Sequence, residues 1–315
     1  MDKLLVTSSP HLRDGDTTQG IMLDVIIAML PCLIASCFFF GMRSLMLTAV
    51  CVVSCVAAEY ITRKIMKRDN TVADLSAVVT GMLLAFNLPV TLNPLFAVIG
   101  SVVAIVVAKQ FFGGLGQNFV NPALVARIVL MVSFPQPMTT FVQPFWYRAG
   151  ADAVSTATPL SILSNGGDVS TIPPYIDLLV GNRAGCLGET CALAIIFGGI
   201  YLVIRRVITP TIPVIYVGTV ALGAVILGND VAVQVLSGGL LLGAVFMATD
   251  YVTSPVTKWG RVIFAFGCGV LTVLIRQFGS LAEGVSYAIL IMNILTPHIE
   301  NLTRPRPFGE ERGKK

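Results

Sequence analysis

The stretch Gly20–Phe40 reads GIMLDVIIAMLPCLIASCFFF, and it determines the class of fold to expect. Its only charged residue is Asp24, and its length matches the roughly 20 residues that a helix needs to cross the hydrocarbon core of a bilayer. Similar apolar runs recur along the chain, which has 315 residues, a mean hydropathy of +0.82 and 12% charged residues. Soluble domains carry about 25% charged residues. The sequence therefore predicts an all-α integral membrane protein in contact with membrane lipid.

About ten apolar ranges are expected to form transmembrane helices. These ranges are 20–40, 44–61, 74–89, 94–112, 122–134, 184–204, 210–228, 232–249, 262–275 and 282–294. Several are shorter than a full crossing and contain Gly or Pro inside or at their ends. Short, interrupted apolar segments are typical of broken or half-spanning helices that are buried against their neighbours.

The distribution of Lys and Arg predicts the orientation of these helices. If the N-terminus is cytoplasmic, the opposite side of the membrane holds only four of the 21 basic residues, namely Arg43, Arg148, Arg183 and Arg276. Basic residues are enriched on the cytoplasmic side of membrane proteins. An even number of crossings also places the basic tail in the cytoplasm. We therefore expect both termini inside, and basic residues that serve topology rather than nucleic-acid binding.

The chain also contains a weak internal repeat. Residues 81–94 read GMLLAFNLPVTLNP, and residues 243–255 read GAVFMATDYVTSP. A basic-Gln-Phe step follows each of them, at 109–111 and 276–278. The offset corresponds to five predicted helices, so the two halves would cross the membrane in opposite directions, as inverted repeats do in many transport proteins. The alternative is a chance similarity between two Gly-rich apolar stretches.

Four regions follow from this organisation. They are a first membrane repeat, 1–134; an extracytoplasmic loop, 135–183; a second membrane repeat, 184–300; and a basic cytoplasmic tail, 301–315. A loop of this length in a compact membrane domain is usually functional or disordered. The loop is therefore the first place to look for chemistry.

The stretch Asp152–Leu160 in this loop reads DAVSTATPL. Its composition indicates a polar turn before a short helix, with Ser155 or Thr158 as the N-cap. It is also similar to the flavinylation motif, in which Asp, two spacers, Ser or Thr, a small residue and Ala precede a Thr that is esterified with FMN phosphate. Thr158 would be that acceptor, Asp152, Ser155 and Ala157 would be motif residues, and Thr156 stands where Gly is common. Attachment requires that the Thr158 hydroxyl be exposed.

Further motifs extend the resemblance over nearly the whole chain. They are Ser9-Pro10-His11, Asp74-Leu75-Ser76-Ala77 with Thr80-Gly81, Gly113-Gly114-Leu115-Gly116-Gln117-Asn118 with Asn121-Pro122-Ala123, Gly188-Glu189-Thr190, and Ala248-Thr249-Asp250 with Thr253-Ser254-Pro255. In this order they resemble the family of the D subunits of Rnf complexes, to which the B subunits of sodium-pumping NADH:quinone reductases are related.

The resemblance implies a component of an electron-transfer complex in a bacterial cytoplasmic (inner) membrane. It implies covalent FMN on Thr158, non-covalent riboflavin as in the reductase, and electron transfer between ferredoxin and NAD coupled to Na⁺ or H⁺ movement. It also implies the A, B, C, E and G subunits of the Rnf complex as partners and a flavin transferase for maturation. The sequence holds no G-x-G-x-x-G turn and no iron–sulfur ligand spacing. We therefore expect no catalytic or metal-ligating residue in this chain.

Two asparagines follow the Gly-rich stretch and are candidates for flavin binding. Asn118 and Asn121 could donate hydrogen bonds to flavin carbonyls. The alternative is that they cap the next helix, in which Pro122 would occupy the first position.

Four acidic residues are candidates for an ion path, because acids inside a membrane are costly and are usually functional. They are Asp24, Glu59, Asp74 and Asp250. Two of them have a structural alternative: Glu59 could pair with Arg63 one turn further on, and Asp74 could cap a helix.

A second class of function fits the same sequence. Inverted repeats and Gly-rich broken helices also suit a channel or secondary transporter for a small polar solute. Fold alone does not decide function. The loop 135–183 discriminates between the classes, since a plain channel has no use for a Ser-Thr-Ala-Thr sequence and would purify colourless.

Overall fold

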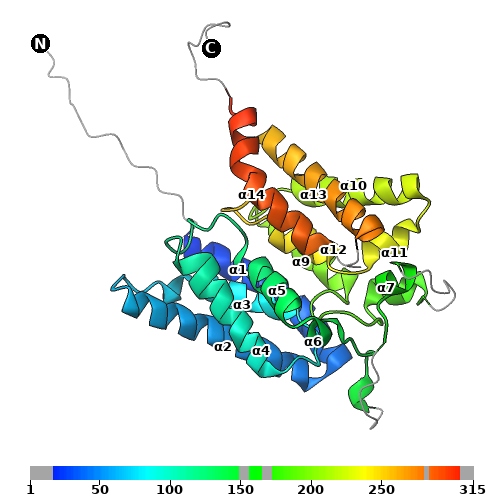
Figure 1. Cartoon of the computed structure of the whole chain (residues 1–315), viewed down its shortest axis with the longest axis horizontal. Coiled ribbons are helices and arrows are strands. Elements are labelled where there is room, and N and C mark those ends of the chain that lie inside the picture. Colours follow the sequence, from blue (N-terminus) through cyan, green and yellow to red (C-terminus); the bar gives the residue numbers. More distant parts are fainter. Residues whose placement is uncertain (1–16, 149–155, 165–171, 280–283, 306–315) are drawn as a thin grey trace, which may run out of the picture.

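The computed structural model describes residues 17–148, 156–164, 172–279 and 284–305, and within these ranges the chain is helical with no strand. Figure 1 shows the first half of the chain, in blue to green, beside the second half, in yellow to red. Short elements connect the two halves: α6 (Pro135–Thr139), η3 (Trp146–Arg148), α7 (Pro159–Ser164) and α8 (Tyr175–Val180). The described part of the loop 135–183 is therefore built of short helices.

The first half is built on two long helices, α1 (Thr18–Phe40) and α2 (Met42–Ile65). Gly41 separates them with a φ of 77°, which an L side chain adopts only with strain. The half is completed by η1 (Val72–Asp74), α3 (Ser76–Phe86), α4 (Pro94–Val102), the π-helix η2 (Val103–Gln110) and α5 (Pro122–Ser133). Asn93 and Asn121 cap α4 and α5, each directly before a Pro at the first helical position.

The second half contains an interrupted helix. Its elements are α9 (Ala192–Ile204), α10 (Thr211–Leu227), α11 (Val231–Leu236), α12 (Leu240–Leu242), the π-helix η5 (Gly243–Met247), α13 (Lys258–Phe278) and α14 (Val285–Thr303). Residues 237–239 break the helix between α11 and α12. A break inside a membrane must satisfy the freed backbone groups. Arg276 does so by donating to the main-chain oxygens of Gln234, at 2.6 Å, and Ser237, at 3.3 Å.

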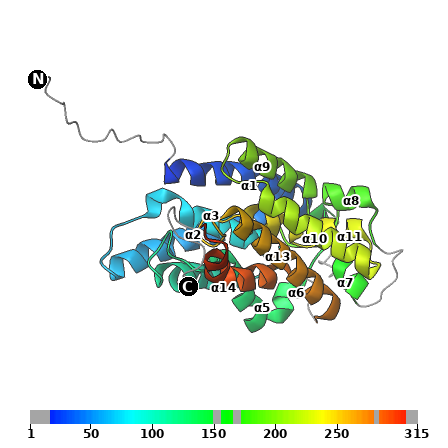
Figure 2. The same cartoon turned by 90° about the horizontal axis from the view of Figure 1, so that it is seen from above.

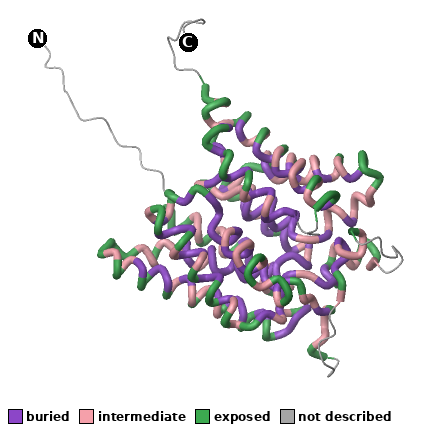
Figure 3. Tube along the Cα trace, in the orientation of Figure 1, coloured by how far each residue is buried: buried purple, intermediate pink, exposed green. Residues whose placement is uncertain are grey.

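Length and composition support the prediction of a membrane protein. Among the described residues, α1, α2 and α13 are long and apolar enough to cross a bilayer. Shorter apolar helices cover 76–86, 94–110, 122–133, 192–204 and 211–227. Large apolar side chains such as Ile65, Phe266 and Ile226 face outward, and Figure 3 shows a buried interior surrounded by exposed and intermediate positions. Apolar exposure of this extent is typical of a lipid-facing surface.

Three predicted ranges differ clearly from the helices that form. The range 282–294 corresponds to α14, which continues beyond it to Thr303. The range 184–204 begins its helix only at Ala192, because residues 183–190 form a compact turn in which Arg183 donates to the main-chain oxygens of Glu189 and Thr190. The range 232–249 is divided among α11, α12 and η5. The expectation of broken helices is confirmed there, whereas an unbroken start at residue 184 is wrong.

The two halves pack directly against each other. Helix α1 lies along α9, as Figure 2 shows from above, and α5 contacts α14. The contact with α9 is close because a Cβ on Gly198 would lie 2.2 Å from the main-chain oxygen of Ala28. In addition, the amides of Leu187 and Gly188 donate to the main-chain oxygens of Leu88 and Phe86. Backbone contacts therefore join the end of α3 to the start of the second half.

Candidate functional site

The segment around Thr158 forms the start of α7. Thr158 Oγ1 accepts a hydrogen bond from the Ser161 amide at 3.3 Å, which is the geometry of an N-cap. The Thr156 amide donates to the main-chain oxygen of Phe141 at 2.9 Å and ties the segment to the preceding loop. The prediction of Thr158 as an N-cap is confirmed. Ala157 is exposed, and Asp152 and Ser155 lie outside the described residues.

Thr158 itself is buried, with 7% of its surface exposed. The expectation of an exposed hydroxyl is therefore wrong for this conformation. The physical reason is that Pro159 and Leu160 are buried as α7 packs inward, and the cap residue is carried with them. Thr158 lines a small cavity of about 10 Å³ together with Arg183, Glu189 and neighbouring small residues. That volume is close to the space that one water molecule needs.

A buried ion pair lies next to this cavity. Arg127 on α5 is 3% exposed, and its Nη1 donates to Glu189 Oε1 at 2.7 Å and to Asn87 Oδ1. Arg127 Nη2 lies 3.8 Å from Cys186 Sγ. Asn87, at the end of α3, also places its Nδ2 3.7 Å from Met247 Sδ in η5. This cluster joins the interrupted helices of the two halves through polar side chains.

A larger cavity of about 90 Å³ lies between the halves. Its polar lining comes from Ser76, Thr80, Lys109, Asn118, Asn121, Thr249, Asp250 and Tyr251, and most of the remaining wall is apolar. Asn121 Oδ1 accepts from the Ala123 amide at 3.0 Å, so its capping role is confirmed. Its Nδ2 donates to the main-chain oxygen of Met247 at 3.4 Å, and Asn118 Nδ2 donates to the main-chain oxygen of Val120 at 3.1 Å. Both predicted asparagines therefore line one cavity at the interface.

Lys109 connects this cavity to a chain of buried polar groups. Its Nζ donates to Glu59 Oε2 at 2.8 Å and to Ser76 Oγ at 2.6 Å. Ser76 Oγ donates onward to Asp74 Oδ1 at 2.5 Å. Glu59 Oε1 accepts from Gln110 Nε2 at 3.0 Å and from Thr71 Oγ1, in the loop after α2, at 2.9 Å. The structure thus brings together two of the four predicted acids, Glu59 and Asp74.

The alternative interpretations of these two acids have different outcomes. Glu59 is fully buried and paired with Lys109, so the suggested interfacial pair with Arg63 is wrong. Lys109 lies closer to the protein interior and satisfies the carboxylate without exposing it. Asp74 accepts from the Ser76 amide at 2.8 Å and so satisfies the first amide of α3, but the N-cap position itself is occupied by Leu75.

The other two predicted acids occupy separate surroundings. Asp24 on α1 accepts from Tyr201 at 2.8 Å and from Arg205 at 3.1 Å, so it joins α1 to α9. Asp250 lines the 90 Å³ cavity and accepts from Thr253 Oγ1 at 3.2 Å. Asp250 therefore shares a cavity with Lys109 and Ser76, while Asp24 belongs to an interhelical pair.

Four basic residues that the topology predicts in loops are buried instead. Lys109, Arg127, Arg183 and Arg276 are 2%, 3%, 4% and 8% exposed, respectively. A charge inside a membrane protein is stable only when it is paired or hydrogen-bonded, and all four have such partners. For two of them the sequence does contain a sign of burial, because Lys109 and Arg127 lie inside the apolar ranges 94–112 and 122–134. The described residues contain no cluster of His, Cys, Asp and Glu that could hold a metal ion.

These features define a polytopic helical membrane protein whose two halves enclose buried charged and amide side chains. Residues 5–309 match the sequence profile of the NQR2, RnfD, RnfE family, and the chain belongs to this family.

Several relatives match the chain over nearly its full length. It is 48% identical over 314 residues to the D subunit of the Na⁺-translocating ferredoxin:NAD⁺ oxidoreductase complex of Acetobacterium woodii, covering 99% of this chain and 97% of that protein. It is 40% identical over 321 residues to the D subunit of the proton-translocating ferredoxin:NAD⁺ oxidoreductase complex of Clostridium ljungdahlii, covering 98% and 96%. It is 38% identical over 339 residues to the D subunit of the ion-translocating oxidoreductase complex of Stutzerimonas stutzeri, covering 95% and 94%.

Proposed function

We propose that this chain is the membrane-embedded D subunit of an ion-translocating ferredoxin:NAD⁺ oxidoreductase, the Rnf complex. Its support is the family and the nearly complete coverage of relatives that carry this name. These relatives are named for Na⁺ in one case and for protons in the other, so the proposal includes both ions. The A, B, C, E and G subunits of the Rnf complex are the proposed partners and supply the reaction parts that this sequence lacks.

The single observation that carries the flavin proposal is the position of Thr158. It ends the Ser-Thr-Ala-Thr sequence, begins α7 and lies in the loop that separates the two halves. FMN esterified to Thr158 would supply the redox chemistry, and the protein would supply position and electrostatics. The 10 Å³ cavity is far smaller than a flavin ring, so the ring would lie outside it. Only the ester end of the cofactor would then contact the cavity walls.

A second, non-covalent riboflavin is proposed to bind between the halves at the 90 Å³ cavity, which would have to widen on binding, because ligand pockets have volumes of about 300–1,000 Å³. Ligand cavities are mainly apolar with a few convergent polar groups, and the lining of this cavity has that composition. Asn118, Asn121 and Lys109 are the side chains that would orient the ring. Lys109 would also place a positive charge beside it.

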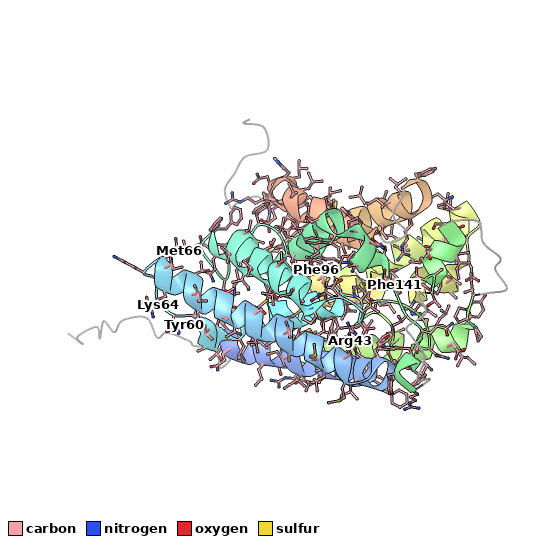
Figure 4. All side chains as sticks on the ribbon, turned by 60° about the horizontal axis from the view of Figure 1, so that its bottom comes forward. Arg43, Tyr60, Lys64, Met66, Phe96 and Phe141 are labelled. Carbon is pink, nitrogen blue, oxygen red and sulfur yellow. The ribbon has the colours of Figure 1, made fainter. Side chains whose placement is uncertain are left out.

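The proposed topology has ten crossings in two inverted repeats, with both termini in the cytoplasm and Thr158 on the opposite side. The ends of α2 are consistent with this orientation. Arg43 lies toward one end, and Lys64 and Met66 lie at the other, as Figure 4 shows. Arg63 and Lys64 fall in the last turn of α2, where the cytoplasmic side is proposed.

A comparison of two neighbouring threonines tests the flavin proposal. The protein would be purified from cells that express the flavin transferase and imaged under ultraviolet light on a denaturing gel. We expect a fluorescent band for the wild-type protein and for Thr156→Ala, and no fluorescence for Thr158→Ala. Thr156 is the matched control because it lies in the same tetrapeptide.

A dark wild-type band would overturn the flavin proposal, provided that the transferase modifies another substrate in the same cells. The channel or secondary transporter for a small polar solute would then be the function to pursue. Fluorescence that persists in Thr158→Ala would show that the flavin is attached elsewhere.

A further inference from the structure

An open groove of about 420 Å³ lies on the outward face of α2, apart from the two cavities described above. Branched and aromatic side chains of α2 line it, namely Val52, Val53, Val56 and Tyr60. The loop that follows α2 adds Asn70 and Val72 as a wall. Ligand pockets have volumes of about 300–1,000 Å³ and are mostly apolar. The groove is therefore large enough, without any widening, for an apolar ligand.

The loop that walls the groove is held in place by the protein itself. The chain reverses at Lys67, whose φ of 53° lies in the left-handed region. Thr71 Oγ1 then donates to Glu59 Oε1 at 2.9 Å, and Arg63 Nη1 donates to the main-chain oxygen of Asp69 at 3.4 Å. The groove therefore has its shape before any ligand binds.

Basic side chains gather at the end of the groove next to this loop. Residues 63–70 contain four basic residues and one acid, which gives a formal net charge of +3. Lys64, Lys67 and Arg68 are exposed, and Lys64 Nζ lies 5.9 Å from the centre of the Tyr60 ring. Figure 4 shows Tyr60 and Lys64 near the same end of α2. Lys and Arg clusters directly after a transmembrane helix attract anionic lipid headgroups, so this end of the groove suits such a headgroup.

The length of the groove matches one leaflet of a bilayer. Val52 and Tyr60 are eight positions apart, which is about 12 Å along a helix. The hydrocarbon core of a bilayer is about 30 Å thick, so one leaflet contributes about 15 Å. The apolar part of the groove therefore lies at the depth of acyl chains, while the basic residues that end α2 lie at the headgroups.

The composition of the groove favours an acyl chain over a helix of another protein. Helices that pack in membranes approach one another through small residues. Four small residues of α2, Ser44, Cys51, Cys55 and Ala58, are buried, and α2 packs against α3 and α4 of this chain. In the groove only Ala57 is small, among β-branched and aromatic side chains. A flexible acyl chain fits between such side chains, whereas a helix backbone is kept at a distance by them.

We propose that this groove binds one phospholipid with an anionic headgroup. An acyl chain would lie along the valines of α2, and Lys64, Lys67 and Arg68 would bind the phosphate group. The bound lipid would brace the loop whose Thr71 donates to the buried Glu59. This inference requires only a location in the membrane, so it is independent of the flavin proposals.

The experiment measures lipid binding to the delipidated full chain in detergent by native mass spectrometry. The protein would be titrated with phosphatidylglycerol or with phosphatidylcholine that has the same acyl chains. One variant replaces the three cations with glutamine, and its control makes the same change at three exposed basic residues of the second half, Arg206, Lys258 and Arg304. A second variant, Val53→Trp, fills the groove. Its control is Val214→Trp on α10, because Val53 and Val214 are 67% and 66% exposed.

We expect the wild type to bind one phosphatidylglycerol about tenfold more tightly than phosphatidylcholine, because only the former headgroup carries a net negative charge. The variant without the three cations should bind both lipids equally weakly. Val53→Trp should weaken the binding of both lipids, because the indole occupies the place of the acyl chain. Both controls should match the wild type.

Equal affinity of the wild type for the two lipids would overturn the inference, and so would a wild-type preference in the variant without the three cations. An equal loss in its control would show a general effect of charge and would also count against the site. A benzophenone amino acid at position 53, activated by light in the membranes of the expressing cells, tests the occupant directly. We expect an adduct with the mass of a phospholipid, whereas an adduct with the mass of a protein would show that another chain covers the groove and would contradict the proposal.

Discussion

Both halves of the molecule place a basic side chain against a serine at an interrupted helix, and they complete the contact differently. In the first half, Lys109 donates to Ser76 Oγ at 2.6 Å, at the first residue of α3. In the second half, Arg276 donates to the main-chain oxygen of Ser237 at 3.3 Å, directly after α11. Both basic residues precede a Gln-Phe pair in the sequence.

The remaining partners of the two basic residues differ. Lys109 also donates to the carboxylate of Glu59 at 2.8 Å, whereas Arg276 donates to the main-chain and side-chain oxygens of Gln234 at 2.6 Å and 3.0 Å. The first half thus has an ion pair, whereas the described hydrogen bonds of Arg276 in the second half go to neutral oxygens. Lys109 also lines the 90 Å³ cavity. Similar backbone arrangements therefore support different chemistry in the two halves, and the first half should be more sensitive to loss of charge.

The largest expected effect is that of Glu59→Gln. This substitution leaves Lys109 as a buried charge without its carboxylate, and breaking such a pair costs about 3–5 kcal/mol. Arg276→Gln should lower the free energy of unfolding by about 1–3 kcal/mol, since the described hydrogen bonds that it removes go to neutral oxygens of Gln234 and Ser237. Unfolding of both variants in detergent micelles would be compared with wild type.

The double variant Glu59→Gln with Lys109→Gln provides the control for this prediction. Removing both charges should recover part of the stability that Glu59→Gln loses. If Arg276→Gln loses as much free energy of unfolding as Glu59→Gln, or more, the prediction that the first half is more sensitive to loss of charge is wrong.

Two glycines at matching positions of the proposed repeat should also differ. A Cβ on Gly81 would lie 2.7 Å from the Cα of Val52, and backbone cannot move aside easily. A Cβ on Gly243 would lie 2.5 Å from Cγ1 of Val285, which is a side chain that can rotate. We expect Gly81→Ala to cost about 1–3 kcal/mol and Gly243→Ala about 1 kcal/mol or less. Thermal unfolding of the two variants would test this order, and the reverse order would contradict the close backbone approach at Gly81.

The smallest expected effect concerns the two serines. Ser76 Oγ bonds to Lys109 and Asp74, so Ser76→Ala should cost about 1–2 kcal/mol. Ser237 Oγ is buried and has no hydrogen-bond partner among the described residues, so Ser237→Ala should be neutral or slightly stabilising. Chemical unfolding would measure both differences. A destabilising Ser237→Ala would indicate that this hydroxyl is used.

The apolar pattern predicts most of the fold, because a bilayer restricts each segment to few conformations. The ranges 20–40 and 44–61 correspond to α1 and α2, and the glycines of the range 232–249 mark a helix that is indeed broken. Hydropathy does not show how helices face one another. The predicted topology therefore assigns Lys109 to a loop, although this residue lies inside the apolar range 94–112. The pair that buries Lys109 joins residues 50 positions apart, and no local pattern reveals it.

The sequence predicts some features of the candidate site and misses others. The two asparagines can be found because they flank a helix start, and the structure places both in the cavity at the interface. Thr158 is predicted as a cap but not as a buried residue, because its burial depends on how α7 packs against residues 183–189. Arg183 carries no signal beyond its position just before an apolar range.

The burial of Thr158 has a consequence for the order of biogenesis. An enzyme that modifies this oxygen must reach it before α7 closes onto the turn of Arg183, or must act during a transient opening of that contact. Modification would then be efficient on newly inserted chains and slow on chains that have completed their packing. Pulse labelling of flavin during synthesis, compared with transferase added after purification, would reveal such a time window.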